Sequence, residues 1–174
     1  MDQPIFPEAK KLQQQFNYPD IVTEHLSGII NAIKPFTCSL LLTGSTARGE
    51  LTCMNIDGIT RVMSDYEFVL VPVNPFEKNK MQILDAIKEL EITYLKNHPL
   101  CHIDISFMNN EGVKSLPKTL QTHENRINGI SMLGEDLRNH MPVVNLNNLD
   151  YKELNEIILW RLLALLLHAP YSLK

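Results

Sequence analysis

The sequence has few of the features that suit an oxidised, secreted or membrane-bound protein. It contains only three cysteines, which are widely spaced and form no C-x-x-C pair. This scattered, odd number favours reduced thiols over a disulfide framework or a zinc site. The N-terminus lacks the basic region and apolar segment of a signal peptide, and the longest apolar run, residues 162–167, is too short to span a bilayer. We therefore predict a cytoplasmic protein that does not contact a membrane.

An excess of positive charge is also missing. The 16 Lys and Arg residues are outnumbered by 20 Asp and Glu, which gives a net charge of −4, so no global field attracts nucleic acid. A template-directed polymerase, which needs a basic track for its strand, is disfavoured. The chain has no repeats, and 44% of its 174 residues are apolar, which suits one packed domain or one domain with the beginning of a second. Any polyanion must therefore be held by a local site.

Helix-like and strand-like segments alternate along the chain. Helical spacing of apolar residues predicts helices over residues 21–33 and 80–95. Short apolar or alternating runs predict strands over residues 39–43, 66–71, 102–108 and, more weakly, 129–133. These segments predict an α+β fold, with a small mixed β-sheet that has helices packed on one face and an open second face.

The C-terminal part of the sequence differs in character. Residues 145–150 are polar and rich in asparagine, which predicts a linker, whereas residues 151–168 read as one helix that is apolar on every side. Such a helix must be buried on every side. We expect one domain over residues 1–145, and we expect residues 146–174 to be either the first helix of a C-terminal helical domain, which we favour, or an oligomerisation helix covered in a homodimer.

The turn after the first predicted strand is a candidate phosphate site. Gly44 and Ser45 follow the apolar strand and open a short helix. Unpaired backbone N–H groups and a hydroxyl at such a helix start can hold phosphate oxygens, and a glycine lets a phosphate approach the backbone closely. Most Gly-Ser pairs after strands are ordinary turns, so an ordinary turn without a bound phosphate remains the alternative interpretation.

Two acids at the start of the second predicted strand strengthen the phosphate hypothesis. Asp65 and Glu67 are two residues apart on a strand and therefore project from the same face. Buried like charges need compensation, and divalent cations are a common source of it, because Mg²⁺ prefers carboxylate oxygens together with substrate phosphates. The alternative is that both acids lie at a frayed strand end in water, paired with Lys or Arg.

A third acid lies in the next predicted strand. Asp104 stands between Ile103 and Ile105 in an alternating segment, so it faces away from the apolar layer. If the strands at residues 66–71 and 102–108 are neighbours, all three carboxylates converge on one face. Three acids beside a phosphate-binding turn indicate phosphoryl or nucleotidyl transfer assisted by two metal ions, typically about 3.5–4 Å apart.

These motifs resemble a known family. Residues 44–49, Gly-Ser-Thr-Ala-Arg-Gly, followed by Ser-Asp-Tyr-Glu at residues 64–67, resemble the signature of the nucleotidyltransferase superfamily related to DNA polymerase beta, nearest the kanamycin and streptomycin nucleotidyltransferases and the minimal nucleotidyltransferases. Asp104 falls where that family has its third carboxylate. Residues 129–137 look like the strand and turn that close the core in antibiotic-modifying members. The resemblance covers roughly residues 36–137 and is dense only at the motifs.

The resemblance implies a role for each motif residue. Gly44 and Ser45 would hold the β- and γ-phosphates of a nucleoside triphosphate. Asp65 and Glu67 would bind a pair of Mg²⁺ ions, with Mn²⁺ as an alternative, and Asp104 would bind the catalytic metal and help to deprotonate the acceptor hydroxyl. The implied activity is transfer of a nucleoside monophosphate, with AMP favoured, from the triphosphate to a hydroxyl of an aminoglycoside-like small molecule or of a protein, with release of pyrophosphate.

Arg48 has two alternative roles of equal weight. Its guanidinium could contact phosphate bidentately, or it could form an ion pair with Glu50 or Asp65.

The sequence departs from the family pattern at two places. Nineteen residues, 46–64, separate the Gly-Ser turn from Asp65, which indicates an inserted loop near residues 51–63 that could shape an acceptor pocket or cover the site. Glu67 stands where Asp is commoner, which changes the metal geometry. These departures leave a second hypothesis open, namely a catalytically degraded nucleotide-binding or interaction module that acts through a protein partner.

Overall fold

The computed structural model describes residues 5–95, 98, 101–149, 152, 155, 158, 159, 162 and 163. The helices are α1 (Pro7–Phe16), α2 (Asp20–Ile33), α3 (Gly44–Arg48), α4 (Phe76–Leu95), α5 (Asn110–Lys114) and α6 (Leu120–Asn128). The strands are β1 (Thr37–Thr43), β2 (Cys53–Ile56), β3 (Ile59–Val62), β4 (Tyr66–Pro72), β5 (Ile103–Phe107) and β6 (Ile130–Leu133). Three short 3-10 turns complete the described elements, namely η1 (Lys34–Phe36), η2 (Leu137–Asn139) and η3 (Leu146–Asn148).

The centre of the fold is a four-stranded sheet with the order β5-β4-β1-β6. Strand β1 is antiparallel to both β4 and β6, whereas β4 and β5 are parallel. The predicted α+β class and small mixed sheet are therefore confirmed. Each of the four strands that the sequence predicts is present in this sheet, and β1 and β4 extend slightly beyond their predicted bounds.

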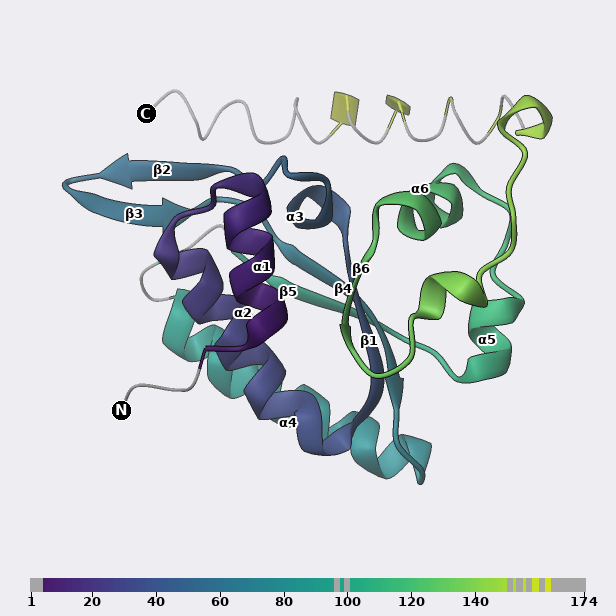
Figure 1. The fold of residues 1–174 in the computed structure, drawn as a ribbon, viewed down its shortest axis with the longest axis horizontal. Coiled ribbons are helices and arrows are strands. Elements are labelled where there is room, and N and C mark those ends of the chain that lie inside the picture. The colour runs from purple at the N-terminus through teal and green to yellow at the C-terminus, as the bar shows by residue number, and fades with distance from the viewer. Residues whose placement is uncertain are drawn as a thin grey trace.

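Both faces of the sheet are covered, but unequally. Alternate residues of β1 and β4, such as Leu42 and Phe68, pack against α1, α2 and α4 in the larger core cluster. The intervening residues, such as Leu41 and Val69, form a second cluster with Val113 of α5. Figure 1 shows α1, α2 and α4 on one side of the sheet and α5 and α6 on the other. The prediction that helices pack on one face only is wrong, because the second face is partly covered by these short helices.

The expected inserted loop contains a β-hairpin. Strands β2 and β3 pair antiparallel as a separate two-stranded sheet, with Ile56 opposite Ile59. Asp57 and Gly58 connect them, and both have a positive φ, 54° and 78°. Positive φ at both central residues is the geometry of the tight hairpin turn that Asp-Gly pairs favour.

The C-terminal prediction falls largely outside the described residues. Within the predicted helix over residues 151–168, the six described positions are helical, and Ile158, Leu159 and Leu162 have exposed side chains. The predicted linker over residues 145–150 contains η3. Among the described residues, no helix is both long and apolar enough to cross a membrane.

Candidate active site

The parallel pairing of β4 with β5 brings two of the three predicted acids together. In this register Glu67 lies opposite Asp104, and directly opposed residues on neighbouring strands project from the same face. Asp65 precedes Glu67 by two residues and lies immediately before β4, where strand alternation would place it on the same face. The sequence left open whether the strands at residues 66–71 and 102–108 are neighbours, and in the structure they are.

The acidic end of this face is open to water. Asp104, His102 and Ser106 are exposed, and Asp65 and Glu67 are half-buried. Further along the same face, the second core cluster lies beneath α5 and η2. The carboxylates thus lie beside the covered part of the face, where a ligand can reach them.

The Asp65 carboxylate is held at the boundary between β4 and β5. Its Oδ1 accepts a hydrogen bond of 2.9 Å from the backbone N–H of His102, and the N–H of Tyr66 donates to the carbonyl of His102 at 2.9 Å. These two bonds fix one carboxylate oxygen of Asp65 relative to the strand that carries Asp104.

The pKa of the Asp104 carboxyl group depends on its neighbours. Partial loss of water around it, and then the negative charge of Asp65, raise the pKa of Asp104, while His102 opposes the shift. A carboxyl group that is destabilised by a like charge is stabilised by a nearby cation. The electrostatics of this face therefore favour a positively charged ligand between the strands.

The Gly-Ser turn lies against one of these acids, Glu67. Gly44 has φ +67°, and a Cβ at this position would lie 2.4 Å from Oε1 of Glu67. Glycine is therefore required both for the backbone conformation and for the close approach of the Glu67 carboxylate. Ser45 follows in α3 and is half-buried. The side chain of Glu67 thus reaches the turn itself.

Two hydroxyl groups bind the turn to β4. Thr43 Oγ1 donates to the carbonyl of Glu67 at 3.2 Å, and Thr46 Oγ1 donates to the carbonyl of Asp65 at 3.4 Å. Both threonines are buried. The sequence reasoning did not single them out, because a threonine beside a Gly-Ser turn carries no signal of its own until the pairing partner is known.

Arg48 forms ion pairs at the end of α3. Its Nε donates to Glu50 at 2.8 Å, and its Nη1 donates to Glu124 at 3.3 Å. The Glu50 alternative is thus present, whereas the described contacts of Arg48 do not include Asp65. Burial lowers the pKa of Arg48, but the hydrogen bond to Glu50 and the charges of Glu124 and Glu67 outweigh it, so the net shift is upward. Glu124 lies 76 residues away in sequence, and local patterns could not have identified it.

The donor chemistry of the site suits a hard divalent cation. In the described part of the chain, no three His, Cys, Asp or Glu side chains form a group that could hold a metal ion unaided. Mg²⁺ is usually bound by one or two carboxylates together with substrate phosphates and water, rather than by a cage made only of protein. Asp65 and Asp104, with Glu67 between the turn and β5, supply oxygens of the required type.

Comparison with known proteins adds no assignment. The chain matches no family model, no curated protein and no solved structure. The functional argument therefore rests on the residues and their geometry.

Proposed function

We propose that this chain is a Mg²⁺-dependent nucleotidyltransferase that transfers a nucleoside monophosphate, with AMP favoured, from a nucleoside triphosphate to a hydroxyl group of a small molecule or a protein. The observation that carries the proposal is the in-register pairing of Glu67 with Asp104, beside a Gly44 turn that lies against the Glu67 carboxylate. A phosphate-binding turn and acids on neighbouring strands are what this chemistry requires.

The phosphates would bind at the turn. The backbone N–H groups at Gly44 and Ser45 would be the donors for the β- and γ-phosphate oxygens. Because α3 is a single short turn, its dipole contributes little, and the local N–H groups supply the main interaction. This arrangement would direct the α-phosphate toward the carboxylates on β4 and β5.

The acids would then position the reacting groups. Asp65, Glu67 and Asp104 would hold Mg²⁺ together with the substrate phosphates, and the ion would supply neutralisation of charge at phosphorus. The acceptor hydroxyl oxygen forms a bond to the α-phosphorus, the bond from the α-phosphorus to the bridging oxygen breaks, and pyrophosphate leaves. Asp104 accepts the hydroxyl proton as the general base.

A second candidate function is a nucleotide-binding module that has lost turnover. Two observations favour it: within the described residues the acids form no ready-made metal group, and Arg48 is occupied by Glu50 and Glu124. Such a module would act through a protein partner.

Transfer of radiolabel distinguishes the two candidates. The protein is incubated with Mg²⁺ and each α-labelled triphosphate, in the presence of aminoglycosides or with the protein itself as acceptor. Label transfer with pyrophosphate release, lost in Asp104→Asn and retained in Asp85→Asn on the exposed side of α4, supports the enzyme. Binding of nucleotide without pyrophosphate release supports the module.

A further inference from the structure

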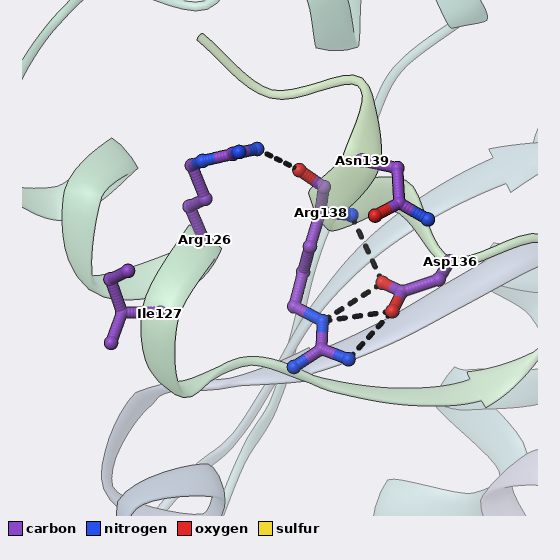
Figure 2. A pocket seen from close by; sticks show the side chains of 5 residues that line it. All are labelled: Arg126, Ile127, Asp136, Arg138 and Asn139. Carbon is purple, nitrogen blue, oxygen red and sulfur yellow. Dashed lines mark hydrogen bonds and ion pairs between the residues drawn. The ribbon is translucent and has the colours of Figure 1, made fainter. Parts of the chain in front are cut away.

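A small pocket lies between α6 and η2. It has a volume of about 190 Å³ and is lined by Arg126, Ile127, Asp136, Arg138 and Asn139. Figure 2 shows the side chains of Arg126 and Arg138 on opposite sides of it. Two guanidinium groups thus line one pocket in a chain whose net charge is −4.

Arg126 brings a positive charge that has no acidic partner among the described residues. Its Nη1 donates to the main-chain carbonyls of Arg138 and Met141, the latter at 3.1 Å. A guanidinium has five N–H donors, and within the described structure Nε and Nη2 of Arg126 have no acceptor. The carbonyl contacts hold the guanidinium at the pocket and leave its remaining donors for a ligand.

Arg138 is held in place by one acid. Its Nε donates to both oxygens of Asp136, at 2.9 and 3.0 Å, and its Nη2 donates to Oδ2 at 2.6 Å. Figure 2 shows that Nη1 points away from Asp136. The side chain of Asp136 also accepts from the backbone N–H of Arg138 at 3.1 Å, which caps η2. Asp136 therefore orients Arg138 and partly neutralises it.

A larger cavity adjoins this pocket and shares Ile127 and Arg138 with it. Its volume is about 530 Å³, and Arg48 and Ser131 are also part of its lining. Three of the five arginines in the sequence thus line two adjoining cavities, whereas none of the lysines that the structure describes does so. Arginine is the residue that binds phosphate and carboxylate groups bidentately.

We infer that the Arg126–Arg138 pocket binds an oxyanion, a phosphate or carboxylate group of a ligand that extends into the larger cavity. The cavity begins at β6, two strands from β4 in the sheet order, which corresponds to roughly 10 Å at about 4.8 Å per strand. The inference does not depend on nucleotidyl transfer, because it concerns a separate set of residues.

Titration with inorganic phosphate and with succinate, in the absence of metal, tests the inference on the full chain. We expect both to bind. Arg126→Gln should weaken binding about tenfold or more, in line with the loss of a charge-assisted hydrogen bond. Asp136→Asn keeps an oxygen to cap η2 but removes the competing charge, so it should tighten binding several-fold. Lys118→Gln, at an exposed position outside the cavity linings, should leave affinity unchanged within about twofold.

The Asp136→Asn variant keeps the test decisive if Arg126→Gln does not fold. Absence of phosphate and succinate binding in both the wild type and Asp136→Asn overturns the inference, as does binding that Arg126→Gln leaves unchanged. Titration with ATP without metal identifies the source of the group. If Arg126→Gln loses ATP binding, the pocket is assigned to a nucleotide phosphate. If Arg126→Gln loses binding of inorganic phosphate but still binds ATP as the wild type does, the pocket is assigned to another ligand.

Discussion

Lowering the pH from 7.5 to 4.5 should destabilise the protein through His25, a residue of α2 that is only 2% exposed. Its Nδ1 lies 3.1 Å from the hydroxyl of Tyr66, and its ring stands edge-on to that of His98 with 4.6 Å between centroids. Burial, and then the charge of His98, lower the pKa of His25 to about 4. Burial and then Arg61 also lower the pKa of His98, whose Nδ1 accepts from the N–H of Val62 at 3.0 Å.

The sign of the effect follows from the two states. Between pH 6.5 and about 4 the unfolded chain takes up a proton at His25, whereas the folded protein does not. The contribution of His25 to the free energy of unfolding is therefore fully present above pH 6.5. It is lost as the pH falls from 6.5 toward 4, because protonation then favours the unfolded chain. For a pKa of about 4 in the folded state and about 6.5 in the unfolded state, the loss at pH 4.5 is about 2–3 kcal/mol of unfolding free energy, a large fraction of a typical 5–15 kcal/mol.

Urea unfolding at both pH values, on the wild type and on His25→Gln, measures this loss. His25→Gln replaces the titrating ring with a neutral side chain, so its free energy of unfolding should fall by about 2–3 kcal/mol less than that of the wild type. His140→Gln, which removes an exposed contact with Glu135, is the matched control and should keep the wild-type pH dependence. An equal pH dependence in the wild type and His25→Gln would refute the reasoning.

Two further predictions concern the site. Gly44→Ala should lower the free energy of unfolding by about 2 kcal/mol or more in a urea titration, because it combines positive-φ strain with a clash against Glu67. The control Gly58→Ala, at a positive φ with open space around it, should lower the free energy of unfolding by only about 1 kcal/mol. Equal losses in the two variants would contradict the contact between Gly44 and Glu67. The rate of label transfer should fall on the acid side, because Asp104 cannot accept the hydroxyl proton once it is itself protonated. Rates measured between pH 4 and 8 check this, and an acid limb that persists in Asp104→Glu at an unchanged midpoint would assign it to another group.

The main sheet was predictable because its strands carry strong patterns. The continuous apolar runs of β1 and β4 and the alternation around Asp104 are visible in the sequence, and each appears as a strand. The hairpin of β2 and β3 was not predicted, since each of its strands is only four residues long, although Asp57-Gly58 is the pair that such turns favour. Helix α1 was also missed, because only Ala9 and Leu12 of its residues are buried, too few for a clear period.

The candidate site was predictable in its residues and not in its contacts. Two-residue spacing placed Asp65 and Glu67 on one face, but the opposition of Glu67 and Asp104 depends on the parallel pairing of β4 with β5. The Arg48–Glu124 pair and the Gly44–Glu67 contact are likewise products of the tertiary fold. Long-range pairs of this kind leave no local pattern, so single-sequence reasoning cannot assign them.

Metal-dependent nucleotide binding tests the central claim most directly. Thermal unfolding is followed with each of the four nucleoside triphosphates, with and without Mg²⁺. The proteins are the wild type, Asp65→Asn and the control Asp85→Asn. Asp65→Asn keeps an oxygen that can accept from the His102 N–H. At about 100 times Kd, binding should add about 2.7 kcal/mol, a rise in Tm of about 5–10 °C. The account predicts this rise for at least one triphosphate, only with Mg²⁺, in the wild type and Asp85→Asn and not in Asp65→Asn. An unchanged Tm with all four triphosphates, or an equal rise in Asp65→Asn, would contradict it.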